Sequence, residues 1–358
     1  MFTMELNGTL SGDMIDELTI VYLVSLSPSV IGSVSVLVVS LVRWKHLKQQ
    51  QVHLLVQLTL ADLLAALTLM FTSVMNRVRT DDSVTICQHS LPLSLTFYFV
   101  SFLLVVVYAW KSKDAIQGWR TRPAEDESEQ SQHRRRMLHI AVNVSVWLIP
   151  TAIYIGYVLT PFMKEALVIP VANKRINIRN NSKYCNSCLL FLHIWRDSCS
   201  DTEFKHDIFI RTFLFLVVIP VMLSCSVIYY KVGKWYERHH SQGIFPVEGD
   251  GRSRRRFSRE FSTARNMVLV ILFCWAPALV LILLSTLMTW THVEQRSLFG
   301  LYVIQAASVS LQGFLNSMVY AWRRPNFTEA VLGENTPLVA HNHMAFFDES
   351  LKSSLTEC

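Results

Sequence analysis

The stretch LNSMVYAWRRPNF, residues 315–327, decides how the rest of the chain is interpreted. Its apolar run carries one amide, Asn316, ends on the aromatic Trp322, and is followed by two arginines and a proline. An apolar run that ends on arginines is typical of a helix that leaves a membrane on the cytoplasmic side. Polar side chains are costly inside lipid, so Asn316 is expected to have a partner on another helix.

The composition points to a membrane protein. Of the 358 residues, 51% are hydrophobic and only 17% are charged, whereas about 25% of the residues of a soluble protein are charged. The formal net charge of +6 is therefore interpreted by the side of the membrane on which the basic residues lie. No nucleic-acid partner is predicted from it.

Seven apolar stretches predict an all-α membrane protein, because each is long enough to cross a ~30 Å hydrocarbon core as a helix. They are residues 18–42, 52–75, 84–110, 137–163, 208–230, 266–291 and 297–322. A short amphipathic eighth helix is predicted at residues 325–332, so that a seven-transmembrane-helix bundle with its eighth helix occupies residues 18–332. Residues 1–17 are predicted as an extracellular N-terminus and residues 333–358 as a disordered cytoplasmic tail.

The basic residues predict the orientation. They follow the first, third, fifth and seventh spans, whereas residues 1–17 hold no lysine or arginine. The N-terminus is therefore placed outside and the C-terminus in the cytoplasm, which leaves the glycosylation sequons at Asn7 and Asn180 on the outer side. The plasma membrane is the expected location. Residues 334–339 resemble an acidic dileucine sorting signal, so an endolysosomal membrane is the alternative.

Asp62 is the only acidic residue deep in any predicted span. Counted at about 1.5 Å rise per residue, Ser101 and Asn316 lie at a compatible depth on the third and seventh spans. An ionisable group at that depth costs about 2.5 kcal/mol or more and needs partners. The carboxylate, hydroxyl and amide oxygens of the three residues suit a sodium ion or a small water cluster. A polar cluster that only joins the helices explains the pattern equally well.

The sixth span holds Cys274-Trp275-Ala276-Pro277. Proline removes a helix hydrogen bond and bends the helix, which membrane helices tolerate. An indole two residues before the bend would lie in the bundle core, between the outer and inner halves. For an isolated Trp-x-Pro, an ordinary kinked helix with a packed tryptophan is the simpler interpretation.

Taken together, these motifs resemble the rhodopsin-like (class A) G-protein-coupled receptors over residues 20–332. The residues that carry the resemblance are Leu58 and Asp62 in span 2, Cys87 at the outer end of span 3, Ser101 deeper in that span, Trp147 in span 4, Pro220 in span 5, Cys274 to Pro277 in span 6, and Asn316 to Tyr320 in span 7, with Phe327 seven residues further on. These residues fall in the spans and in the order in which that family has them, so the resemblance implies the same seven-helix bundle.

The resemblance also implies roles for particular residues. They are a sodium pocket at Asp62, Ser101 and Asn316, switch roles for Trp275, Pro277 and Tyr320, an eighth helix that begins at Phe327, and a disulfide from Cys87 to the second outer loop, with Cys185 or Cys188 favoured over Cys199. By resemblance, an extracellular ligand of unknown identity would bind between the outer ends of the spans. A heterotrimeric G protein or arrestin would bind at the cytoplasmic face.

The chain departs from the family pattern at three places. Lys111-Ser112-Lys113 stands where these receptors have Asp/Glu-Arg-Tyr, and Ser112 replaces the arginine. Ser33 replaces the asparagine of span 1, and Ser317 replaces the proline of span 7. A divergent, orphan receptor that signals is the first functional hypothesis. The missing arginine favours the alternative, a receptor-shaped protein that scaffolds, traffics or modulates partner membrane proteins.

Other membrane classes lack the residues they need. Residues 297–322 hold no lysine for a retinal Schiff base. The histidines near the span ends lie on opposite sides of the membrane and cannot form a zinc centre, so no enzyme activity is predicted. Ser258 follows Arg255-Arg256-Phe257 and resembles a basophilic kinase site, although a basic strip beside anionic lipid is the commoner use of such residues.

Overall fold

A computed structural model describes most of the helical part of the chain. The described residues are 10–42, 50–78, 83–118, 129–159, 187–192, 251–287 and 295–323, with scattered positions between 212 and 234. The helices are α1 (Gly12–Val42), α2 (Gln50–Val78), α3 (Ser83–Gly118), α4 (Glu129–Leu159), α8 (Gly251–Leu287), the short 3-10 helix η2 (Gln295–Leu298), α9 (Phe299–Ser310) and α10 (Gln312–Arg323).

These helices confirm an all-helical, multi-pass membrane fold. Five of the described helices are long and apolar enough to cross a membrane, and α9 with α10 adds a sixth if the bent pair counts as one span. The predicted span at residues 208–230 is described only at scattered helical positions. The count of seven spans therefore stays a prediction.

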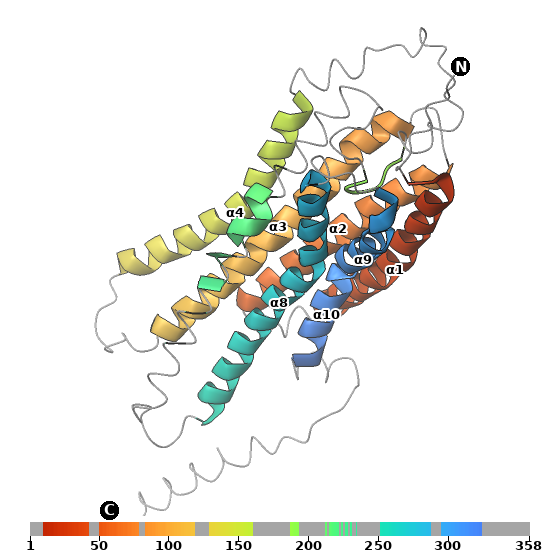
Figure 1. Cartoon of the computed structure of the whole chain (residues 1–358). Coiled ribbons are helices and arrows are strands. Elements are labelled where there is room, and N and C mark those ends of the chain that lie inside the picture. Colours follow the sequence, from red (N-terminus) through yellow and green to blue (C-terminus); the bar gives the residue numbers. More distant parts are fainter. Residues whose placement is uncertain are drawn as a thin grey trace, which may run out of the picture.

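The described helices form a bundle around α3. Helix α3 packs against α2, α4 and α8, while α1 packs against α2, α9 and α10, and α8 closes the bundle against α9 and α10. Figure 1 shows α1, α2, α9 and α10 side by side, with α4 at the opposite edge against α3. The largest fully buried side chain is that of Trp275, which lies among these helices.

Two helices expose broad apolar faces. Ile31 on α1 is 67% exposed and Leu148 on α4 is 61% exposed, and both belong to rows of exposed branched aliphatic residues. Because water does not tolerate apolar faces of this extent, they are the lipid-facing surface of the bundle. The bilayer is thus the one partner that the fold itself requires.

Several helices extend beyond the predicted spans. Helix α1 begins at Gly12 instead of residue 18, and α8 begins at Gly251, so the basic run that follows is helical instead of being a loop. Helix α4 begins at Glu129 and ends at Leu159. The charge-free stretches measure only the part of a helix that lies in hydrocarbon, and a helix continues into water while its backbone bonds are kept.

Some predictions fall outside the described residues. These are the eighth helix at residues 325–332 with Phe327, the tail at residues 333–358, Cys185, and the sequons at Asn7 and Asn180. For Tyr320 and Ser258 the structure gives only the helix on which each lies, α10 and α8 respectively.

The last span is not one continuous helix. Helix α9 ends at Ser310, α10 begins at Gln312, and their axes are bent by 43°. The residue between them, Leu311, has φ −80° and ψ −4°, whereas an α-helix has ψ of about −42°. The break thus lies six residues before Ser317, the place of the family's proline.

Candidate functional site

The structure brings Asp62, Ser101 and Asn316 together in the bundle core. Asp62 lies on α2 and is 2% exposed, and the other two residues are fully buried. The hydroxyl of Ser101 donates to Oδ1 of Asp62 at 2.7 Å, and the amide of Asn316 donates to Oδ2 at 2.7 Å. Helices α2, α3 and α10 therefore each supply one member of the cluster that the depth count predicted.

A fourth member, Gln312, was not predicted. Its Nε2 donates to Oδ1 of Asp62 and to Oγ of Ser101, both at 3.2 Å. Its Oε1 accepts a hydrogen bond of 2.6 Å from the indole of Trp275 on α8. The signal in the sequence is the spacing of Gln312 and Asn316, since residues four apart lie on one helix face. We call Asp62, Ser101, Gln312 and Asn316 the Asp62 site.

The Asp62 site is rich in donors and poor in positive charge. The three side chains that donate to Asp62 are neutral. A carboxylate held only by neutral groups in a bundle core is costly, and a bound cation or proton would lower that cost. No group of three His, Cys, Asp or Glu side chains suited to a metal ion occurs among the described residues, so the site does not resemble a zinc or calcium centre.

The oxygens of the site fit a sodium ion. Oδ1 of Asn316 is buried and has no hydrogen-bond partner among the residues that the structure describes. If the amide turned over, this oxygen would face the carboxylate of Asp62, which is favourable only with a cation between them. With Oγ of Ser101, the site then offers carboxylate, amide and hydroxyl oxygens, the ligand types that hard cations prefer.

Trp275 connects the Asp62 site to α8, the helix that contains Pro277. Its ring meets the rings of Tyr98 and Phe102 edge to face, with centroids 5.2 Å away in both cases. Pro277 lies inside α8 two residues further on. Near this proline, the hydroxyl of Ser308 on α9 donates to the carbonyl of Cys274 at 2.9 Å. The indole is thus held by two aromatic rings from α3 and one amide from α10.

Small residues bring α1 and α10 into close contact. A Cβ placed on Gly313 would lie 3.2 Å from Oγ of Ser33 and 3.3 Å from Cβ of Ser29. A Cβ on Gly32 would lie 3.3 Å from Cβ of Ser317. Small residues at such crossings allow membrane helices to approach closely. Ser33, which stands in the place of the family's asparagine, is fully buried in this contact.

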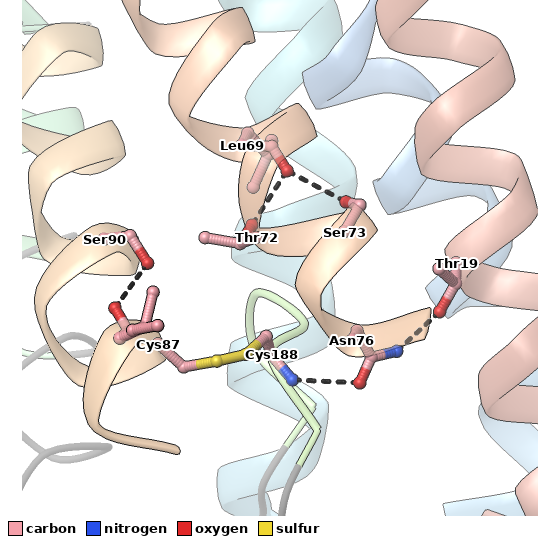
Figure 2. Close-up of a disulfide and its surroundings, with 9 residues drawn as sticks. Thr19, Leu69, Thr72, Ser73, Asn76, Cys87, Ser90 and Cys188 are labelled. Carbon is pink, nitrogen blue, oxygen red and sulfur yellow. Dashed lines mark hydrogen bonds between the residues drawn. A yellow bond between two sulfur atoms is a disulfide. The ribbon is translucent and has the colours of Figure 1, made fainter. Parts of the chain in front are cut away.

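A disulfide and an asparagine organise the end of the bundle at which α3 begins (Figure 2). Cys87 at the start of α3 is bonded to Cys188 of the loop segment 187–192. Asn76 on α2 donates to the hydroxyl of Thr19 on α1 at 2.7 Å and accepts from the backbone N–H of Cys188 at 3.3 Å. This amide therefore joins two helices to the loop that the disulfide already holds.

The loop segment 187–192 lies inside the bundle. All six residues are buried, among them the run Leu189–Leu192. Phe191 has a φ of 63°, which is rare for a bulky residue and shows that packing overrides backbone preference there. Gln295 donates to the carbonyl of Leu192 at 2.8 Å and to the hydroxyl of Tyr302 at 3.0 Å. The signal in the sequence was the run of five apolar residues at 188–192, which follows the mostly polar residues 173–187.

The C-terminal part of α3 carries an unusual lysine. Nζ of Lys111 is buried and has no hydrogen-bond partner among the described residues. It lies beside Ser112, the residue in the place of the family's arginine. Where the resembled receptors have an acid and an arginine, this chain therefore presents an ammonium group and a hydroxyl-bearing residue.

Comparison with known protein families gives a match over most of the chain. The profile of the family described as Transmembrane protein 116 matches residues 16–336. The matched region begins in α1 and extends past the end of α10, so it includes all four residues of the Asp62 site.

Proposed function

The chain belongs to the Transmembrane protein 116 family of multi-pass membrane proteins, and we propose that it is a receptor that senses an extracellular stimulus and signals through its cytoplasmic face. The observation that carries this proposal is the continuous set of hydrogen bonds from Trp275 through Gln312 to Asp62. It joins α8 to the polar centre of the bundle, so movement of one changes the contacts of the other.

The outer end supports a route by which a stimulus reaches that centre. The loop segment 187–192 contacts the last span through Gln295, and the same span carries Gln312 and Asn316 further inward. An extracellular ligand that shifts this segment would therefore act on α9 and α10. Two packings of the bundle, one favoured by the ligand, are sufficient for signalling.

The Asp62 site would bind sodium in one of these packings. The carboxylate of Asp62 and the unpartnered Oδ1 of Asn316 are the oxygens on which this part of the proposal rests. Asp62→Asn keeps the size of the side chain and removes its charge. The variant should lose any difference in melting temperature between sodium chloride and potassium chloride, and an unchanged difference would exclude sodium binding at Asp62.

Signalling itself is tested by G-protein dissociation in cells. We would measure basal dissociation for each G-protein class with the unaltered chain and with Ser112→Arg, which introduces the arginine of the resembled receptors, using Ser112→Ala as the matched control. Surface expression is measured in the same cells. Higher basal dissociation with Ser112→Arg than with Ser112→Ala supports the receptor. No dissociation from any variant at normal surface expression contradicts it.

The second candidate is a receptor-shaped protein that scaffolds, traffics or modulates partner membrane proteins. It is favoured by Lys111 on α3, whose Nζ is buried and has no hydrogen-bond partner in the described part of the chain. This part of α3 is predicted to lie at the cytoplasmic end. A buried cation of this kind attracts a carboxylate, so an acidic segment of a partner would bind there. Proximity labelling that enriches one membrane protein with the unaltered chain but not with Lys111→Met would support this function.

A further inference from the structure

The break in the last span is not caused by proline. Sharp kinks in helices arise at proline, at glycine or serine pairs, at π-bulges, or where a side chain enters the backbone hydrogen-bond ladder. The residue at the break is Leu311, and the last span holds no proline before Pro325. Ser310 and Gly313 flank the bend of 43° between α9 and α10 and make it easier to form, while the contacts there point to a side chain that enters the ladder.

Ser29 on α1 supplies that side chain. Its hydroxyl donates to the backbone carbonyl of Ser310 at 2.5 Å and accepts from the backbone N–H of Phe314 at 3.1 Å. Residues 310 and 314 are four apart, so in an uninterrupted α-helix this N–H would donate to this carbonyl directly. One hydroxyl from another helix thus stands between the two backbone groups and satisfies both.

The backbone bonds on each side of this insertion are kept. The N–H of Leu311 donates to Ala307 and the N–H of Leu315 donates to Leu311, both at 3.0 Å. The opening is therefore local. Ser29 can reach it because it is fully buried and because Gly313 leaves room: a Cβ there would lie 3.3 Å from that of Ser29.

The opening determines where the amides of the Asp62 site point. Gln312 is the first residue of α10, directly after the break, and Asn316 lies one turn further on the same face. Both donate to Asp62. If the N–H of Phe314 were bonded to Ser310, the bend would decrease and both amides would turn relative to α2.

We propose that Ser29 is the positioning residue of the Asp62 site: its hydroxyl holds the last span open at residues 310–314, in place of the proline that this chain lacks, and so directs Gln312 and Asn316 to Asp62. Release of the hydroxyl lets the span straighten, which gives the bundle two discrete arrangements. The positioning role of Ser29 is argued only from its contacts with Ser310 and Phe314. The use of the straightened arrangement for signalling rests on the proposed function.

The first test is a double-mutant cycle on the purified full chain in detergent. Ser29→Ala should lower the melting temperature, on the order of 5 °C. Either the two backbone groups stay apart and lose their partner, or they bond to each other and turn Gln312 and Asn316 away from Asp62. In the Asp62→Asn background the same change should cost clearly less, since residues that act through one site are not additive. Ser27→Ala is the matched control, because the Ser27 hydroxyl donates within α1, to Leu23. Equal effects of Ser29→Ala in both backgrounds would overturn the proposal.

The second test uses proline and remains decisive if Ser29→Ala does not fold. Proline has no N–H and opens a helix four residues before it. At residue 314 it removes a donor that the helix does not use, whereas at residue 315 it removes the bond to Leu311. Phe314→Pro should therefore keep most of the yield of folded protein and should restore the melting temperature of Ser29→Ala, while Leu315→Pro should do neither.

If both proline variants are equally damaging, Ser29 does not hold the span open and the proposal is wrong. These measurements need no G protein. A chain that passes them and yet shows no G-protein dissociation would keep the positioning role of Ser29 and lose the proposed signalling function. The two failures are thus distinguishable.

Discussion

Gly313→Ala places a methyl group at the closest contact between α1 and α10. The new Cβ would lie 3.2 Å from Oγ of Ser33, 3.3 Å from Cβ of Ser29 and 3.5 Å from Cβ of Asp62. The Ser33 hydroxyl has no hydrogen-bond partner among the described residues and can turn away. The Cβ atoms of Ser29 and Asp62 are bonded directly to the backbones of α1 and α2 and cannot move without them, so these helices must retreat from α10.

The expected free-energy change combines two effects. Overpacking a well-packed contact costs about 1–3 kcal/mol, while alanine is a better helix former than glycine by about 1 kcal/mol. The difference, about 1 kcal/mol of destabilisation, lowers the melting temperature by roughly 2–4 °C. The same change also moves Ser29 relative to Phe314, so any sodium dependence of the melting temperature should decrease with it.

Gly156→Ala on α4 is the control, because a Cβ there meets nothing within 4 Å. It keeps the gain in helix propensity without the contact and should raise the melting temperature by roughly 2–4 °C. Thermal unfolding of both variants in the same detergent is the measurement. If Gly313→Ala is as stable as Gly156→Ala, α1 and α10 are not in close contact and the geometry argued for Ser29 is wrong.

The remaining predictions concern three buried polar groups. Asn76→Leu should destabilise the fold by about 1–3 kcal/mol and speed reduction of the disulfide at Cys188, which mass spectrometry after timed exposure to a thiol would measure; an unchanged rate would contradict the link. Trp275→Phe and Gln312→Leu should each lower the melting temperature, and the double variant should cost less than their sum; additive effects would mean that their hydrogen bond is not shared. Lys111→Met should raise the melting temperature because it removes a buried, unpartnered cation, whereas a decrease would show that the ammonium group has a partner.

The sequence was sufficient to predict most of the Asp62 site. Helical rise fixes depth once the ends of a span are known, so counting residues placed Ser101 and Asn316 level with Asp62. Gln312 was missed because Asn316 was the one residue of the last span considered as a partner of Asp62, although the spacing between Gln312 and Asn316 is visible in the sequence. The exposed apolar rows of α1 and α4 were also predictable, because a span without charged residues has only apolar or neutral side chains to expose to lipid.

Other features depend on contacts between helices and could not be predicted by counting residues along a span. The insertion of Ser29 requires that α1 and the last span approach closely, which depends on glycines in both helices at matching heights. The burial of loop segment 187–192 depends on the space that the helices leave between them. Helix ends also extend beyond the hydrocarbon, so the start of α8 at Gly251 left no sign in a search for charge-free stretches.

Two serines together explain where the last span bends. Ser317 stands where the resembled receptors have proline, and its hydroxyl donates to the carbonyl of Gly313, one turn before it, at 2.7 Å. A residue with a backbone N–H at this place does not open the helix as proline does. Ser29 instead opens it one turn earlier, at Ser310 and Phe314. The bend is therefore displaced toward Asp62 instead of being lost, and its position depends on a contact with α1 that a proline-bent span would not need.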